Sequence, residues 1–225
     1  MSTVGGGVNI VTNGLVLYLD ASNTKSYVSG STTWNDVSRS GSNYRGILTN
    51  GPDFSSTNGG SILFDGTNDY LANNTYSPFV VGSMTYEIIF KANSNPTNGP
   101  LGSTDVINTV PYFYLDYGGG NIRTYHVGSS PQYYTVKSLS VGTINHFVCT
   151  RNGLVESNYS NGVSTLGRTL SNSTGNCNGF GGVGGFSLLS IYFNCNVYMI
   201  RIYNRALSAA EVLQNYNATK SRFGL

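Results

Sequence analysis

The chain has 225 residues, which is enough for one large all-β domain or two small domains. Charged residues make up only 10% of it and the net charge is +2, with Lys and Arg scattered along the sequence. The sequence therefore predicts no nucleic-acid partner. No apolar run approaches the roughly 18 residues of a membrane span, so no membrane insertion is expected.

The first residues, "MSTVGGGVNIVTNG", have neither the basic start nor the apolar run of a signal peptide. We therefore expect synthesis in a cytoplasm and three cysteines that stay reduced. Cys177 and Cys195 could pair, but the odd count favours small buried apolar residues instead. Residues 1–13 are expected to form a flexible or docking arm.

Alternation of apolar and polar residues dominates the rest of the chain and predicts many short strands. Leu15, Leu17 and Leu19 share one face of a nearly continuous apolar run, which indicates a strand covered on both sides. Clusters of glycine and asparagine, such as "DGTND" and "YGGGN", separate the runs. The pattern favours an all-β sandwich or jelly roll over a parallel βαβ sheet. Further alternating runs lie at residues 61–66, 84–92, 110–120, 143–153 and 191–206.

One helix is predicted near the C-terminus, with two turns that pack on the sandwich edge in a structural role. Ser208 is a natural N-cap, and Glu211 lies three residues on, where it completes a capping box. Leu207 and Val212 are placed to close a hydrophobic staple. The expected apolar stripe is Val212, Leu213 and Tyr216.

The ordered motifs resemble the laminin G-like branch of the concanavalin A-like lectin/glucanase superfamily. They include "GLVLYLDAS", "GGSILFDGTNDYL", "MTYEIIFKA" and "NVYMIRIYNRALSAAEVLQNY", and the resemblance covers nearly the whole chain. It implies a two-sheet antiparallel β-sandwich (jelly roll, concanavalin A-like) over residues 14–217, with about six strands per sheet and one short C-terminal helix. Residues 218–225 are expected to be a tail. The loop from Asp36 to Asn43 departs from the family's pattern, which leaves open the register of any ligand there.

The ending "YNATKSRFGL" is also similar to the tails of lectin-like domains in tailed-bacteriophage virion proteins. This resemblance implies a structural protein of the virion surface: a capsid decoration, a head fibre or a tail component. Its partners would be other virion proteins or further copies of itself. A charge-poor chain rich in Gly, Asn and Tyr, made in the host cytoplasm without a signal peptide, agrees with that location.

Catalysis is disfavoured by the distribution of the carboxylates. The glucanase relatives imply two carboxylates facing each other at about 5 Å for retaining or about 6.5–9.5 Å for inverting hydrolysis. The three glutamates of this chain, Glu87, Glu156 and Glu211, lie in different segments. Glu87 shares a strand face with Lys91, which predicts a solvated face or a cross-strand pair. We therefore expect a non-enzymatic protein rather than a glycoside hydrolase.

The two histidines, His126 and His146, lie in separate predicted strands and are interpreted as ordinary strand residues. No His or Cys spacing of a zinc site is present. A structural calcium ion is an open alternative, because relatives of the laminin G type bind calcium near the sandwich rim. The competing interpretation is that "DGTND" is a turn whose side chains cap nearby amides. The candidate oxygen ligands are Asp20, Asp36, Asp65, Asn68 and Asp69.

Glycan binding is suggested by tyrosines between residues 111 and 137. Sugars stack their apolar C–H faces on aromatic rings and pair their hydroxyls with carboxylates and amides. The alternative is that these are half-buried sheet tyrosines with wet hydroxyls. Trp34 is expected to pack rather than bind. A stand-alone carbohydrate-binding module therefore remains the alternative to a virion structural role, and a surface lectin of a phage would be both. The candidate residues are Tyr112, Tyr114, Asp116, Tyr125, Tyr133 and Tyr134.

Overall fold

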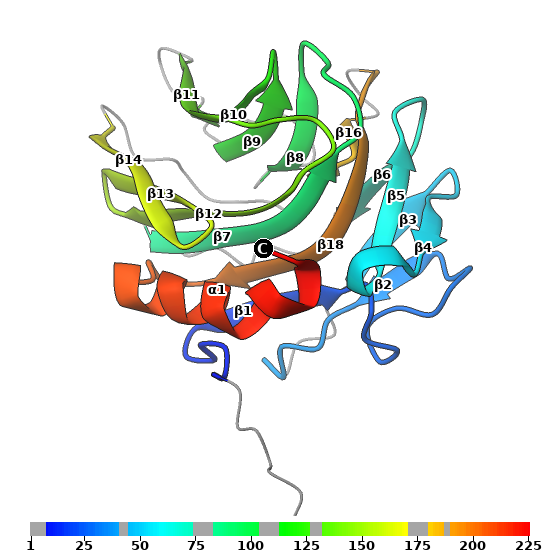
Figure 1. Cartoon of the computed structure of the whole chain (residues 1–225), viewed down its shortest axis with the longest axis horizontal. Helices are drawn as coiled ribbons and strands as arrows, with labels where there is room; N and C mark the ends of the chain where they lie inside the picture. Colours follow the sequence, from blue (N-terminus) through cyan, green and yellow to red (C-terminus); the bar gives the residue numbers. More distant parts are fainter. Residues whose placement is uncertain are drawn as a thin grey trace, which may run out of the picture.

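Two antiparallel sheets pack face to face around one core, and a single helix, α1 (Ala209–Phe223), lies across the outer face of one of them (Figure 1). The computed structural model describes residues 8–40, 45–73, 83–103, 113–126, 132–170, 180–186 and 190–225. The predicted fold class, an antiparallel β-sandwich with one C-terminal helix, is confirmed.

The sheet beneath the helix, here called sheet A, has eight strands in place of the expected six or so. Its strands are β1 (Leu15–Asp20), β4 (Asp53–Ser55), β5 (Ser61–Asp65), β7 (Ser83–Ala92), β12 (Ile144–Asn152), β13 (Val155–Ser160), β14 (Val163–Thr169) and β18 (Asn194–Tyr203). Their spatial order is β14-β13-β12-β7-β18-β5-β4. Strand β1 pairs with the C-terminal half of β18, beside the half that β5 occupies.

The opposite sheet, sheet B, also has eight strands, in the order β11-β10-β9-β8-β15-β6-β3-β2. They are β2 (Thr33–Asn35), β3 (Arg45–Thr49), β6 (Tyr70–Asn73), β8 (Gly99–Ser103), β9 (Phe113–Gly118), β10 (Asn121–His126), β11 (Gln132–Ser138) and β15 (Phe180–Val183). A small pair, β16 (Gly185–Phe186) and β17 (Ile191–Tyr192), and a 3-10 turn, η1 (Thr57–Gly59), complete the described elements.

The core lies between the sheets and is built from the alternating residues identified in the sequence. Leu17, Phe64 and Ile88 come from β1, β5 and β7 and are fully buried there. Trp34 is also fully buried, which confirms that it packs in the core. The two described cysteines, Cys149 and Cys195, are free and buried, while Cys177 lies outside the described residues.

Helix α1 is longer than predicted, with 15 residues, and it covers a sheet face rather than an edge. The capping box is present: the Ser208 hydroxyl accepts from the Glu211 N–H, and the Glu211 carboxylate accepts from the Ser208 N–H. The predicted stripe is wrong at Leu213, which is 45% exposed. The face of α1 that contacts sheet A carries two polar residues, and a search for apolar periodicity does not identify these positions. Its buried residues are Val212, Asn215, Thr219 and Phe223.

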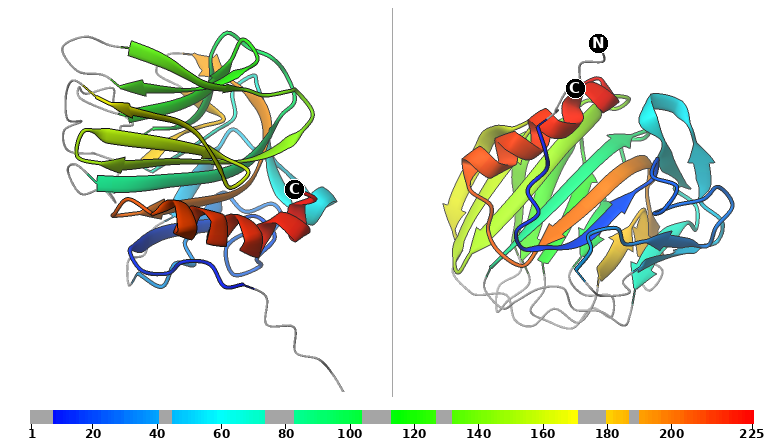
Figure 2. Two further views of the ribbon diagram at one scale, coloured as in Figure 1. Left: turned by 60° about the vertical axis from the view of Figure 1, so that its left-hand side comes forward. Right: turned by 90° about the horizontal axis from the view of Figure 1, so that it is seen from below.

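Both ends of the described chain dock on sheet A, and the N-terminal segment runs along the middle of α1, as the view from below shows (Figure 2). Val11 is buried, and its N–H donates to the Asn215 side chain at 2.8 Å. The boundary expected at residue 217 is wrong, because α1 continues to Phe223, which is 3% exposed and packs on Tyr198. The last turn also donates from Arg222 to the Asp20 carboxylate at 2.7 Å. Among the described residues, no helix is long and apolar enough to span a membrane.

Candidate functional site

The outer face of sheet B holds a fixed ion pair between neighbouring strands. Asp116 on β9 lies opposite Arg123 on β10, and the guanidinium donates to both carboxylate oxygens, at 2.8 and 2.6 Å. The Arg123 side chain is 18% exposed, whereas that of Asp116 is fully buried. Burial raises the pKa of Asp116, and the ion pair with Arg123 offsets this only in part. Arg123 was not identified from the sequence.

The glycine-rich turn between β9 and β10 creates this pairing. Gly119 and Gly120 both have positive φ, at 58° and 78°, as a tight hairpin turn requires. The turn pairs Gly118 with Asn121, and this strand register places Asp116 opposite Arg123. A Cβ atom at Gly118 would clash with the backbone carbonyl of Thr97 and with the Arg123 guanidinium, so only glycine permits this approach. The "YGGGN" motif, read as a two-residue hairpin turn, was the sequence signal that could have found Arg123.

Tyr125 shares this outer face with the ion pair, because it lies two residues beyond Arg123 on the same strand. Its side chain is half-buried. The Tyr114, Tyr125 and Tyr133 positions lie opposite one another on β9, β10 and β11. Tyr112 lies outside the described residues, and of Tyr114 and Tyr133 only the backbone is described.

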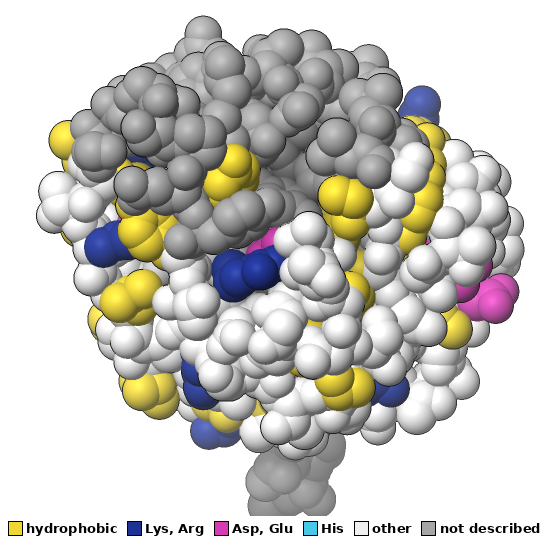
Figure 3. Space-filling view, turned by 90° about the horizontal axis from the view of Figure 1, so that it is seen from above, with side chains coloured by type: hydrophobic (Ala, Val, Ile, Leu, Met, Phe, Trp, Pro, Cys, Tyr) yellow, Lys and Arg dark blue, Asp and Glu magenta, His cyan; other side chains and the backbone are white. Residues whose placement is uncertain are grey.

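Two further acceptors hold the guanidinium in place from the segment before β8. Arg123 donates to the Thr97 carbonyl at 2.8 Å and to the Asn98 side-chain oxygen at 3.0 Å. We call Asn98, Asp116, Arg123 and Tyr125 the β9–β10 face. A space-filling view of this side shows basic and acidic side chains adjacent at the centre, on a described surface that otherwise carries few charges (Figure 3).

Tyr134 does not belong to this face, contrary to the set predicted from the sequence. It lies opposite Thr124, which is buried between the sheets, and its ring centroid is 3.4 Å from the Arg168 guanidinium carbon. The tyrosines at 133 and 134 are adjacent on one strand, so they belong to opposite sheet faces. The β9–β10 face therefore keeps Asp116 and Tyr125 of the predicted residues but loses Tyr134.

Each glutamate is engaged in a structural interaction. The prediction of a solvated face for Glu87 is wrong, because α1 covers that face and buries Glu87 completely. The alternative, a cross-strand pair, is confirmed: Glu87 lies opposite Arg201, with 2.9 Å between carboxylate and guanidinium. Glu156 is buried on the inner face of sheet A, 2.8 Å from Arg168. Glu211 caps α1 and pairs with Arg205 at 2.6 Å.

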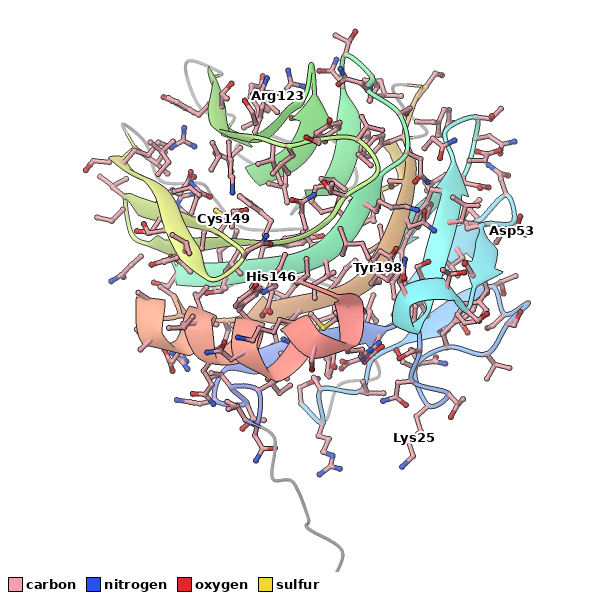
Figure 4. The ribbon with its side chains drawn as sticks, viewed as in Figure 1. Lys25, Asp53, Arg123, His146, Cys149 and Tyr198 are labelled. Carbon is pink, nitrogen blue, oxygen red and sulfur yellow. The ribbon has the colours of Figure 1, made fainter. Side chains whose placement is uncertain are left out.

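His146 is a buried strand residue, as expected, and its Nε2 atom lies 2.8 Å from the Glu87 carboxylate. Figure 4 shows it next to α1 on the side that faces the sheet, well away from Arg123. Of His126 only the strand position is described. His146 therefore belongs to the contact between sheet A and α1 rather than to the β9–β10 face.

The five candidate calcium ligands do not form one site. Asp20 lies opposite Met199 and Asp65 lies opposite Asn194, five residues away along β18, or about 17 Å. Asp20 is bonded to Arg222, and Asp36 accepts from the Tyr18 and Ser38 amides at 2.7 and 2.8 Å. Within the described part of the chain, no three His, Cys, Asp or Glu residues are grouped as metal ligands.

The "DGTND" stretch behaves as the turn interpretation expects. The Asp65 carboxylate accepts from the Thr67 N–H at 2.7 Å. Hydrogen bonds from the backbone amides of the turn hold the pKa of Asp65 below its usual value. The Asp69 carboxylate accepts from the Asp65 N–H at 3.1 Å, while burial raises the pKa of Asp69. Asn68 lies in the same turn. A calcium ion at residues 65–69 therefore stays a prediction for this turn alone, supported by the oxygen-rich side chains there.

The sequence was compared with known families and structures. Residues 65–213 match the family model described as the Concanavalin A-like lectin/glucanases superfamily. The chain belongs to this superfamily. The match confirms the resemblance found from the motifs. A search of curated proteins gave no match to the chain.

Solved structures with a similar fold include longer chains, of which this chain matches a part. Trypanosoma rangeli sialidase in complex with sialic acid matches 99% of this chain with a TM-score of 0.69 and 16% identity. The receptor binding domain of botulinum neurotoxin D matches 92% with a TM-score of 0.70 and 13% identity. The binding domain of Paraclostridial Mosquitocidal Protein 1 matches 92% with a TM-score of 0.68 and 15% identity. This chain covers 36% of the sialidase chain and 53% and 52% of the other two. At such identities the likeness concerns the fold.

Proposed function

We propose that this chain is a non-enzymatic, lectin-like domain that binds a glycan on its β9–β10 face. The observation that carries the proposal is the Asp116–Arg123 pair beside Tyr125. Asp116 is fully buried and bonded through both oxygens, so the guanidinium is held in one orientation before any ligand arrives. A polar group fixed in advance loses little conformational entropy when it binds.

The chemistry of this face suits a sugar. A half-buried tyrosine ring offers an apolar surface for the C–H face of a sugar ring. Arg123 supplies a polar group two residues from Tyr125 on the same strand face, where a hydroxyl would lie, and Asn98 is bonded to the guanidinium. Membership of a superfamily that includes lectins supports this reading.

The non-enzymatic part of the proposal is supported by the three glutamates. Glu87 and Glu156 are both fully buried, on opposite faces of sheet A, and each is paired with an arginine. Glu211 is bonded to the start of α1. Most glycoside hydrolases use two carboxyl groups that face a common sugar.

The proposal is tested on a broad glycan array with purified wild-type protein and Tyr125→Ala. The wild-type protein should bind a subset of glycans, and Tyr125→Ala should lose that signal while keeping its melting temperature. Tyr70→Ala is the matched control, because Tyr70 is a half-buried strand tyrosine of the same sheet outside the face. A folded wild-type protein with no signal, or an unchanged Tyr125→Ala, contradicts glycan binding here. Release of reducing sugar from a bound polysaccharide contradicts the non-enzymatic assignment.

A structural role on a virion surface is the second candidate, and the two roles are compatible. It is supported by the charge-poor composition, with 29 glycines and 17 tyrosines, and by the resemblance of the C-terminal residues to phage proteins. Its partners would be other virion proteins or further copies of the chain. The chain should then co-purify with intact particles through a density gradient at a fixed copy number. Recovery only in the soluble fraction would contradict this role.

A further inference from the structure

A separate pocket lies where the loop after β1 meets the connection between β3 and β4. Its volume is about 290 Å³. This lies at the lower end of the roughly 300–1,000 Å³ found for small-molecule sites, so one sugar-sized ring suits it better than an extended chain. Leu48 and Pro52 are buried and form an apolar part of its lining.

Two aromatic rings form one wall of the pocket. Tyr27 and Phe54 have ring centroids 5.6 Å apart at an interplanar angle of 36°. Tyr27 is only 3% exposed, whereas Phe54 is partly exposed. The wall therefore combines a fixed ring with one that a ligand can reach.

The polar part of the lining includes the carboxylate of Asp53. Asp53 is exposed, and within the described residues its side chain makes no hydrogen bond or ion pair. Asp53 and Tyr27 both line the pocket. Burial raises the pKa of Tyr27, a backbone hydrogen bond from Gly30 lowers it, and the charge on Asp53 raises it. Ser31 and Thr32 add hydroxyl groups, and no described lining residue is Lys or Arg.

The loop that carries Tyr27 and Ser31 is held at several points. The Tyr27 N–H donates to the Asn23 carbonyl at 2.8 Å, and the Leu48 N–H donates to the Thr32 carbonyl at 2.8 Å. The Ser31 hydroxyl donates to the Thr33 carbonyl at 3.0 Å. The Leu48–Thr32 bond joins the loop to β3, and the other two bonds hold the loop itself. The pocket is therefore fixed before a ligand arrives, which lowers the entropy cost of binding.

We propose that this pocket binds one neutral sugar ring, a hexose or an N-acetylhexosamine. The apolar face of the sugar packs on the Phe54 ring, which the buried Tyr27 ring supports, and adjacent hydroxyls donate to the Asp53 carboxylate. Each oxygen of a carboxylate accepts hydrogen bonds, so two neighbouring hydroxyls can be bound at once. A lining with a carboxylate and no described cation repels anionic sugars such as sialic acid.

This site is independent of the β9–β10 face. In Figure 4 Asp53 lies at the rim beside β4, far from Arg123 near the top of the molecule. A substitution at one site therefore leaves the other intact. If glycan binding at Tyr125 is not found, the pocket proposal still stands. If the pocket binds no sugar, the proposal for the β9–β10 face still stands.

The test uses the full-length ¹⁵N-labelled protein and amide chemical shifts. The probes are the methyl glycosides of glucose, galactose, mannose and N-acetylglucosamine, with N-acetylneuraminic acid as the anionic comparison. At least one neutral glycoside should shift the Gly30, Ser31 and Gly51 amides saturably. N-acetylneuraminic acid should not shift them. If none of the neutral probes shifts these amides, or if the acid binds as well as they do, the proposal is overturned.

Two variants and a control assign the effect to the pocket. Asp53→Asn should raise the Kd of the best neutral glycoside about tenfold, as expected for loss of a charge-assisted hydrogen bond. Phe54→Leu, which keeps an apolar side chain but removes the ring, should raise it as well. Lys25→Gln is the control, because Lys25 is an exposed charge of the same loop outside the lining. Thermal unfolding verifies that each variant is folded, and an unchanged Kd in folded Asp53→Asn overturns the proposal.

Discussion

Glu87 on β7 and Arg201 on β18 form an ion pair of 2.9 Å that is completely buried between sheet A and α1. The same carboxylate contacts His146 at 2.8 Å and accepts from the Asn215 side chain of α1 at 2.8 Å. Burial by itself would raise the pKa of Glu87, but Arg201, His146 and Asn215 together more than offset it and the pKa is lowered. The helix is thus attached to the sheet through a charged group rather than through apolar contacts alone.

Arg201→Met should destabilise the protein by about 3–5 kcal/mol, because it leaves the Glu87 carboxylate buried without its main counter-charge. The measurement is urea unfolding at pH 7, followed by the fluorescence of buried Trp34. The matched control is Arg205→Met, which breaks the partly exposed pair with Glu211 and should cost about 1 kcal/mol or less. If both variants lose the same free energy of unfolding, the buried ion pair stabilises the protein no more than the partly exposed one.

Phe223→Ala should cost about 3–5 kcal/mol, because it removes a buried ring that packs on Tyr198 and Met199. Leu213→Ala, on the exposed side of the same helix, should change the free energy of unfolding by less than about 0.5 kcal/mol. Both values come from the same urea titration. If Phe223→Ala proves as mild as Leu213→Ala, the last turn of α1 is dispensable and residues 218–225 form a tail after all.

Acid should destabilise the protein partly through Glu211, whose pKa is lowered to about 2 by Arg205 and by the amide and hydroxyl of Ser208. Its unfolded pKa is about 4.3, so the folded state gains stability from Glu211 above that pH. That contribution is lost as the pH falls from about 4.3 towards 2. Glu211→Gln should therefore flatten the decline of the free energy of unfolding in this window. Leu213→Ala should keep the wild-type slope, and identical slopes for Glu211→Gln and wild type would refute the assignment.

A calcium ion at residues 65–69 predicts that millimolar calcium raises the melting temperature relative to EDTA. Asp65→Asn should remove that rise, since it takes away a charged oxygen of the turn. Asp36→Asn is the comparison, because Asp36 lies outside the turn and should leave the calcium response intact. A melting curve that calcium and EDTA leave unchanged rules out the ion.

The strands and the fold class followed from local pattern. The alternation in residues 84–92 predicted a strand, and the four residues that share one of its faces, Met84, Tyr86, Ile88 and Phe90, lie together in the core, because side-chain direction in a strand depends only on sequence parity. The capping box of α1 was identified for a similar reason, since Ser208 and Glu211 interact three residues apart. The predicted Asp116 and Tyr125 lie on one face because both positions are fixed by one short hairpin.

Other features depended on contacts between residues that are distant in sequence. The polar face that contains Glu87 looked solvated, and only the docking of α1, more than a hundred residues later, made it an interior surface. The pocket at Asp53 likewise combines residues 27–32 with residues 48–54, from segments that carry no shared motif. The sandwich, the alternating faces of its strands and the start of α1 follow from the sequence, because they depend on local periodicity and capping. The burial of polar residues and the grouping of side chains on one surface emerge only in the folded chain, because both depend on which distant segment packs against them.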